Sequence, residues 1–184
     1  MARLLMTIVA LLTLSACADT GLLSEVPIDG QNAVYRLDSG DRLRVIVFGQ
    51  TDLSGEYAVD GAGQISIPLV AAIQARGLTT DELEQSVVAI LSQTLLRNPS
   101  VSVEVLVFRP FFILGEVTNA GQYPFVAGMT VKTGVAIAGG YTHRANTDVV
   151  RITRNLGDRI IEIGVNTNTA VSPGDTIFVR ERYF

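Results

Sequence analysis

The residue types that could carry out catalysis are few in this sequence and lie far apart. His143 is the only histidine and Lys132 is the only lysine. General acid and base chemistry, or the binding of a catalytic metal, needs several such groups brought together. No spacing in the sequence indicates that the carboxylates Asp148 and Glu162 lie beside His143. We therefore expect no enzyme activity, no metal and no cofactor, and we expect His143 on a solvated loop.

The only cysteine, Cys17, ends a segment with the order of a secretory signal. Arg3 precedes an apolar run at residues 4–14, and two small residues separate that run from the cysteine. The run is shorter than the roughly 20 residues of a membrane-spanning helix. We interpret residues 1–16 as a lipoprotein signal peptide and Cys17 as a lipidated residue; the alternative is an ordinary signal peptide with an incidental cysteine. Because Ala18 rather than Asp follows, the expected location is the outer membrane, at its periplasmic face.

The charge of the chain excludes one large class of partner. The full sequence has 14 basic and 18 acidic residues, and removal of residues 1–16 takes away the basic residue Arg3. An acidic chain of this kind is not expected to bind nucleic acid. Since Cys17 is the only cysteine, the chain has no disulfide framework. Its stability must come from the packing of apolar side chains.

Residues 17–34 show no sustained hydrophobic period, and we expect them to tether the lipid anchor to a first folded unit at 35–108. Alternating apolar residues predict the strands of this unit, and a capping box at Thr79 and Glu82 predicts its helix. The expected elements are a strand at 43–47, a strand pair around a hairpin-like turn at 60–63, a short alternating stretch at 64–67, the helix after Thr79, and a strand at 101–107.

A second folded unit is predicted at 109–184. Thr130 can cap a short helix, and Gly139 and Gly140 suit its C-terminal end. Strands are expected at 112–117, 123–126, 149–152, 160–163 and 176–179, with a turn at 119–121. Strands, a hairpin and one helix in each unit predict an α+β fold class. No segment of helical length follows the last expected strand, so we expect no C-terminal transmembrane helix.

One short pattern occurs in both units. Gly40 and Asp41 begin the sequence Gly-Asp-Arg-Leu-Arg-Val, and Gly174 and Asp175 begin Gly-Asp-Thr-Ile-Phe-Val. In one interpretation each is a tight turn that feeds a strand, because glycine adopts positive φ readily and aspartate hydrogen-bonds nearby backbone. In the other interpretation the repeated carboxylates bind a ligand. We favour the turn interpretation, since it explains the residues without a ligand.

A longer series of residues runs in order through both units. In the first unit the series is Tyr35, Leu37, Gly40, Asp41, Leu43, Val45, Val59, Asp60, Gly61, Ile65, Pro68, Gly77, Leu78, Thr79, Leu83 and Pro99 to Val103. It resembles the polysaccharide export domain of the outer-membrane polysaccharide export family. In the second unit the series is Gly115, Glu116, Val117, Gly121, Tyr123, Ala138, Gly139 and Gly140. It resembles the β-grasp domain, of the SLBB type, that follows in those proteins.

The residues that we expect to shape the backbone are drawn from these motifs. They are Gly40, Asp41, Asp60, Gly61, Gly115, Glu116, Gly121, Gly139, Gly140, Gly174 and Asp175. Their expected role is structural, in turns and close approaches of the chain.

The resemblance implies a protein without catalytic activity that takes part in capsular or exopolysaccharide export. It implies a homo-oligomeric ring, lipid-anchored at the outer membrane, that receives the polysaccharide chain from an inner-membrane polysaccharide copolymerase. Long members of the family build their pore with a C-terminal helix, so a separate outer-membrane channel protein is expected here. The alternative is a monomeric periplasmic lipoprotein that binds a soluble ligand or glycan through its β-grasp domain.

The sequence departs from the family pattern at three positions. Ala120 stands in place of a proline before the turn glycine, and Thr133 and Gly134 replace an acidic residue and an alanine in the short helix. Glycine inside a helix costs about 0.5–1 kcal/mol relative to alanine. We therefore expect that helix to be frayed.

Several arginines are candidates to contact an acidic polymer. Solvated strand and loop faces explain them more simply, since arginine is mostly found at protein surfaces. The residues concerned are Arg42, Arg44, Arg97, Arg144, Arg151 and Arg154.

Overall fold

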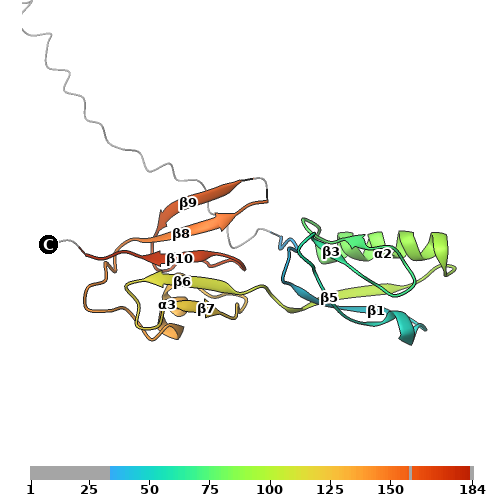
Figure 1. Cartoon of the computed structure of the whole chain (residues 1–184), viewed down its shortest axis with the longest axis horizontal. Helices are drawn as coiled ribbons and strands as arrows, with labels where there is room; N and C mark the ends of the chain where they lie inside the picture. The colour runs from blue at the N-terminus through green and yellow to red at the C-terminus, as the bar shows by residue number, and fades with distance from the viewer. Residues whose placement is uncertain (1–33, 158, 183–184) are drawn as a thin grey trace, which may run out of the picture.

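The computed structural model describes residues 34–157 and 159–182 (Figure 1). Cys17, the expected signal peptide at 1–16 and the expected tether up to residue 33 lie outside the described residues. The described chain forms two units side by side, connected by residues 108–110 (Figure 1). Each unit has its own hydrophobic core, with buried residues from Leu37 to Val103 in the first and from Phe111 to Val179 in the second.

The first unit has a three-stranded antiparallel sheet with helix α2 packed against it (Figure 1). The strand order is β2-β1-β5. Helix α2 contributes the buried residues Leu83, Val87 and Leu91 to the core. A single-turn 3-10 helix, η2, and a small two-stranded sheet of β3 and β4 complete the unit. The bounds are Arg42–Val47 for β1, Thr51–Leu53 for η2, Gly55–Ala58 for β2, Gln64–Ile65 for β3, Ile73–Gln74 for β4, Thr80–Thr94 for α2 and Val101–Val107 for β5.

Local sequence signals determine the first strand and the long helix. Exposed and buried residues alternate strictly along β1, which is the period of a strand with one face in the core. At the start of α2, the Thr79 hydroxyl accepts a hydrogen bond from the Glu82 N–H at 3.1 Å, and the Glu82 carboxylate accepts one from the Thr79 N–H at 2.9 Å. That backbone hydrogen bond also lowers the pKa of Glu82. The predicted strand at 43–47 and the predicted capping box are confirmed.

The strand pair predicted around residues 60–63 has a different pairing. The turn itself forms, because the Asp60 carbonyl accepts the Gly63 N–H at 2.9 Å. However, β2 before the turn pairs with β1, and β3 after the turn pairs with β4. Ile65 and Ile73 lie opposite each other and are buried in the first core. Burial of these apolar side chains therefore decides the register, rather than closeness in sequence.

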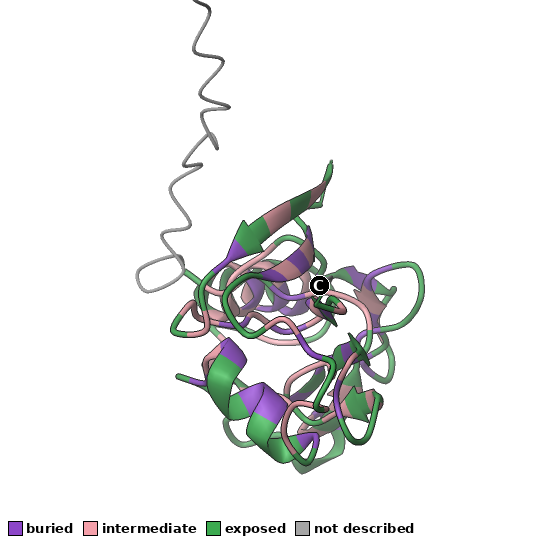
Figure 2. Ribbon diagram, turned by 90° about the vertical axis from the view of Figure 1, so that its left-hand side faces the viewer, coloured by how far each residue is buried: buried purple, intermediate pink, exposed green. Residues whose placement is uncertain are grey.

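The second unit has a five-stranded sheet in the order β7-β6-β10-β8-β9. Strands β6 and β10 are parallel, and the other neighbours are antiparallel. The return strand predicted at 123–126 is earlier, because Gly121 already pairs with Ile113. Exposed and partly exposed residues alternate along most of the edge strand β9, and its last residue, Val165, is buried (Figure 2). The bounds are Phe111–Gly115 for β6, Gly121–Tyr123 for β7, Val131–Ile137 for α3, Val150–Asn155 for β8, Ile160–Val165 for β9 and Thr176–Val179 for β10.

Helix α3 continues through Gly134, so the predicted fraying is wrong. The Gly134 N–H donates to the Thr130 carbonyl at 2.9 Å, and the Gly134 carbonyl accepts the Ala138 N–H at 3.1 Å. The Thr133 hydroxyl accepts the Thr130 N–H at 2.8 Å and so completes a capping box in place of an acidic residue. A Cβ at Gly134 would lie 3.2 Å from Cε2 of the buried Phe111. The glycine thus allows close packing on the sheet, which offsets its helix propensity cost.

Both units combine a sheet with a helix, so the predicted α+β class is confirmed. Within the two described ranges, no helix has both the length and the apolar character that a membrane span requires.

Candidate functional site at the junction of the two units

The carboxylate of Asp41 is fully buried and accepts hydrogen bonds from both sides of the junction. Its Oδ1 accepts the backbone N–H of Arg109 at 2.8 Å. Its Oδ2 accepts the Tyr35 hydroxyl at 2.6 Å and the Asp38 N–H at 2.8 Å. The Arg109 guanidinium adds an ion pair at 3.4 Å. A buried carboxylate is stable only when its charge and lone pairs are satisfied in this way, so Asp41 ties the connecting segment to the first unit.

Tyr35 and Phe108 extend this junction with aromatic contacts. Burial raises the pKa of the Tyr35 phenol well above its usual range, and its hydrogen bond to Asp41 raises it further. The phenol therefore stays protonated and donates to Asp41. The Arg109 guanidinium lies 5.6 Å from the centre of the Tyr35 ring. The Phe108 ring makes edge contacts with Tyr35 at 5.0 Å and with Phe125 of the second unit at 5.5 Å, so one aromatic chain spans the two units.

Asp175 occupies the equivalent position in the second unit. Its carboxylate accepts two hydrogen bonds from Arg154, from Nε at 2.9 Å and from Nη2 at 2.7 Å. Oδ2 also accepts the Ser172 N–H at 2.7 Å. The Ser172 contact repeats that of Asp38 with Asp41, since each donor precedes its aspartate by three residues. The Arg154–Asp175 ion pair is bidentate. This is the strongest form of an arginine–carboxylate contact, because the planar guanidinium matches the geometry of the two carboxylate oxygens.

The Arg109 side chain packs against both of the Gly-Asp turns. A Cβ at Gly40 would lie 3.5 Å from the Arg109 Cβ, and a Cβ at Gly174 would lie only 2.7 Å from the Arg109 Nε. Both glycines have positive φ, +94° and +84°. The Gly174 N–H donates to the Pro110 carbonyl at 3.1 Å. The repeated pattern therefore forms two turns that face the same connecting segment, and both carboxylates accept donors of the chain itself, which favours the turn interpretation over a ligand site.

The other motif residues of the first unit build a separate turn. The Asp60 Oδ1 accepts the N–H groups of Ala62 and Gln64, each at 2.9 Å. The Gly61 carbonyl accepts a hydrogen bond from Arg76 at 3.0 Å. Asp60 thus hydrogen-bonds the backbone of its own turn, and Arg76 links this turn to the Asp38 carboxylate at 2.8 Å.

The remaining motif residues of the second unit join the turn after β6 to the end of α3. Gly115 has a φ of +88°, and Glu116 accepts a hydrogen bond from the Thr142 hydroxyl at 2.5 Å. Gly121 lies in β7, opposite Ile113. The carbonyls of Gly139 and Gly140 accept the Thr118 hydroxyl at 2.9 Å and the Thr118 N–H at 3.0 Å. These contacts join neighbouring segments of the second unit through both side chains and backbone.

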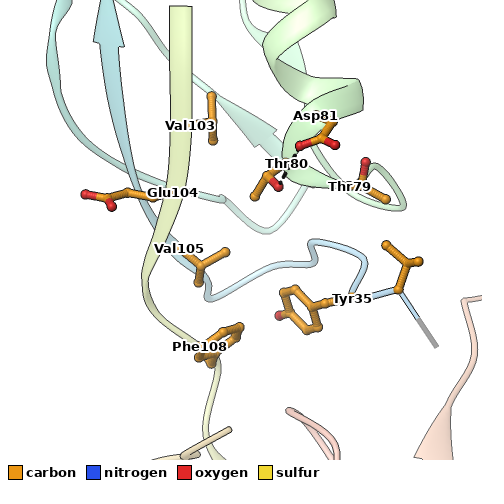
Figure 3. Close-up of a pocket in the computed structure, with 9 residues that line it drawn as sticks. Tyr35, Thr79, Thr80, Asp81, Val103, Glu104, Val105 and Phe108 are labelled. Atoms are coloured by element: carbon orange, nitrogen blue, oxygen red, sulfur yellow. Dashed lines mark hydrogen bonds between the residues drawn. The ribbon is translucent and has the colours of Figure 1, made fainter. Parts of the chain in front are cut away.

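An open groove of about 450 Å³ lies beside the junction (Figure 3). Strand β5 forms one wall with Val103 and Val105, and the first turn of α2 forms the other with Thr80 and Asp81. Tyr35 lies at the end of the groove (Figure 3). The groove leaves one side of the junction open to solvent.

The residues with catalytic potential are not assembled. His143 is exposed in the turn before Ala145, as expected, and Lys132 is exposed on α3. Glu162 forms an ion pair with Arg151 at 2.8 Å. Across residues 34–157 and 159–182, no three His, Cys, Asp or Glu side chains gather in a way that could hold a metal ion.

Most of the arginines considered as polymer contacts are paired with carboxylates. Arg42 pairs with Glu56 and Arg44 with Glu104, both at 2.7 Å, on the exposed face of the first sheet. Arg144 pairs with Glu181, and this hydrogen bond raises the pKa of Arg144. Arg154 is buried against Asp175, so for this residue the surface interpretation is wrong.

The sequence pattern does not identify the partners of the two buried aspartates. Arg109 is 68 residues from Asp41, and Arg154 is 21 residues from Asp175. The available signal is the repeat itself, because two aspartates at the starts of core strands need donors or cations nearby. Only the folded chain shows which residues supply them.

Two α+β units, each with its own core and linked through the buried carboxylate of Asp41, define a two-domain protein. Family models agree. The model for the polysaccharide biosynthesis/export protein family matches residues 29–106, and the SLBB domain model matches residues 110–163. The chain therefore contains a polysaccharide biosynthesis/export domain followed by an SLBB domain.

Two similar proteins carry names that concern the production or transport of polysaccharides. The exopolysaccharide production protein ExoF of Rhizobium meliloti is 33% identical over 124 residues, which are 61% of this chain and 30% of that protein. The polysialic acid transport protein KpsD of Escherichia coli is 27% identical over 164 residues, which are 83% of this chain and 29% of that protein. The chain thus spans less than a third of the length of these relatives.

Proposed function

We propose that this protein is a lipid-anchored component of capsular or exopolysaccharide export. In this proposal it forms an oligomeric ring on the periplasmic side of the outer membrane and passes the polysaccharide across the periplasm. The observation that carries the proposal is the order of the two domains, an export domain followed by an SLBB domain. The relatives are named for exopolysaccharide production and polysialic acid transport, which supports a polysaccharide as the cargo.

The junction supports a ring built from subunits of fixed shape. We place the export domain at 35–108 and the SLBB-like domain at 109–184. A ring closes only if each subunit presents its two interfaces at a constant angle. The buried contacts of Asp41, Tyr35 and Arg109 hold the segment between the domains in one arrangement. Subunits joined in this way can repeat the same angle around a ring.

Membrane attachment in this proposal depends on Cys17, with residues 17–34 as the tether. Stable anchoring takes two or more acyl chains, and a bacterial lipoprotein cysteine carries that number. We predict that Cys17→Ser releases the protein from membranes and impairs export. The measurement is membrane fractionation of cells that carry the variant. A Ser variant that stays with the membranes would show that another contact holds the protein there.

The proposal also names partners. An inner-membrane polysaccharide copolymerase delivers the chain, and a separate outer-membrane channel protein receives it. Crosslinking in intact cells, followed by purification of the full chain, tests both contacts. Capture of neither a copolymerase nor an outer-membrane channel would remove these partners from the proposal.

Gene deletion and complementation test the function itself. We expect deletion to abolish surface polysaccharide and the full chain to restore it. Light scattering of the full chain in detergent then gives its oligomeric state. Normal surface polysaccharide in the deletion strain overturns the export function, and a monomer overturns the ring and favours a periplasmic lipoprotein that binds a soluble ligand or glycan.

A further inference from the structure

The sheet of the second unit has one face in the core and one face open. On β6 and β10, Phe111, Ile113, Ile177 and Val179 are fully buried. The alternating residues of the same strands point to the other side, and Phe112, Leu114 and Phe178 are 38%, 46% and 43% exposed. Large apolar side chains at this exposure on a sheet face indicate a contact surface rather than a core.

The pairing of β6 with β10 places these three side chains in one apolar strip. The strands are parallel, with Phe178 opposite Leu114 and Thr176 opposite Phe112. A Cβ at Gly115 would lie 3.3 Å from Cε2 of Phe178, so the Phe178 ring lies beside a residue that has no side chain. On the Gly115 side, therefore, no side chain of β6 covers this ring.

Polar groups flank the strip on both sides. On β7, Gln122 pairs with Phe112. On β8, Arg151 pairs with Phe178 and Thr153 with Thr176. The Arg151 guanidinium and the Glu162 carboxylate on β9 form an ion pair at 2.8 Å, and about half of each side chain is exposed. Amide, hydroxyl and charged groups thus surround two aromatic rings on an open surface.

We propose that this apolar strip, formed by Phe112, Leu114 and Phe178, binds segments of the exported polysaccharide. The proposal rests on the export function above and names the surface that the cargo contacts. The C–H faces of a sugar ring carry slightly positive hydrogens, and the face of an aromatic ring is negative. Stacking on Phe112 and Phe178 therefore uses the apolar side of the sugar, while Gln122 and the Arg151–Glu162 pair hydrogen-bond its hydroxyls.

The composition of the face favours a glycan over a second copy of the chain. A stable protein interface takes roughly 20–30 residues on each side and has few charged residues at its centre. Here the strip itself has three apolar side chains, and Ile160 on β9 is a further exposed apolar residue of this face. An ion pair stands directly beside the strip on β8 and β9. A narrow apolar strip between polar groups matches the alternating apolar and hydroxylated surfaces of a sugar chain.

The test replaces the two rings and keeps the strand. Phe112→Thr combined with Phe178→Thr removes both rings and retains a residue type suited to strands. Phe112→Tyr combined with Phe178→Tyr keeps the rings. The matched control is Phe48→Thr, because Phe48 is a 69% exposed aromatic residue of the first unit. The probe is the surface polysaccharide of the source bacterium, cut to short oligosaccharides and titrated into the full chain in detergent.

We expect about tenfold weaker oligosaccharide binding for the Thr pair, and unchanged binding for the Tyr pair and for Phe48→Thr. Light scattering on the same samples should give an unchanged particle mass. Unaltered binding by the Thr pair overturns the inference. So does a fall in particle mass, because the face is then covered by a second copy. If the wild-type chain binds no oligosaccharide while gene deletion still abolishes export, this inference fails and the proposed function stands.

Discussion

Arg109 donates its backbone N–H to the Asp41 carboxylate at 2.8 Å, across 68 residues of sequence. The donor belongs to the segment between the two units, and the acceptor lies at the start of the first core strand. Because Asp41 is fully buried, this contact cannot be exchanged for water without exposing the core. The link between the domains is thus part of the packed structure.

Replacing Asp41 should destabilise the protein strongly. Asp41→Ala removes the acceptor of the Tyr35 hydroxyl and of two backbone N–H groups, and it leaves the largely buried Arg109 without its carboxylate partner. Breaking a buried ion pair from one side costs about 3–5 kcal/mol. The measurement is urea unfolding of the full chain. The control is Asp52→Asn at an exposed position, expected within about 0.5 kcal/mol of the wild type. An equal effect of the two variants would contradict the role given to Asp41.

Arg154 should matter far more than its neighbour Arg151 on the same strand. Arg154→Ala leaves the buried Asp175 carboxylate unpaired and should lower the free energy of unfolding by about 3–5 kcal/mol. Arg151→Ala breaks an exposed ion pair with Glu162, which is worth about 0–1 kcal/mol. Both variants are compared in the same urea titration. Similar losses for the two would show that burial does not decide the strength of these pairs.

The Tyr35 phenol should make the protein sensitive to alkali. Its pKa is raised in the folded protein above the ordinary value of about 10. A raised folded pKa contributes stability that is fully present below the unfolded pKa and is lost as the pH rises above it. The free energy of unfolding should therefore fall above about pH 10. Burial also raises the pKa of Tyr57 and Tyr141, so the Tyr35 share is isolated by comparison with Tyr35→Phe. The slope should be shallower in that variant, and identical slopes would remove Tyr35 from the explanation.

Hydrophobic periodicity and helix-capping residues predict those parts of the fold that depend on contacts between residues close in sequence. The capping box at Thr79 forms because its partner, Glu82, is within one turn of helix. Strand β10 lies where the alternation places it, at 176–179. The pairing of β2 with β1 could not be read in this way, since it depends on which apolar residues the whole unit buries.

The junction is the part of the site that sequence reasoning cannot complete. The repeated Gly-Asp pattern predicts turns, and glycines with positive φ are found at both positions. Both turns face a single residue, Arg109. This arrangement depends on how the connecting segment crosses between the units, which the sequence pattern does not give. Gly134 is a second case that the sequence alone does not explain. A glycine is needed there because the helix packs closely against Phe111, and helix propensity does not report that distance.

Two motif glycines of the second unit should respond in opposite ways to alanine. Gly115 has a φ of +88°, and a Cβ there would lie 2.0 Å from the Val179 carbonyl oxygen. That overlap must separate β6 from β10, so Gly115→Ala should cost about 3 kcal/mol or more, from backbone strain and overpacking together. A Cβ at Gly121 would meet no atom within 4 Å, and the φ of this glycine is not positive. Gly121→Ala should therefore be neutral or slightly stabilising, by up to about 1 kcal/mol, because alanine reduces the freedom of the unfolded chain. Thermal unfolding of both variants measures the difference, and equal melting temperatures would show that the sheet can move to accept a side chain at Gly115.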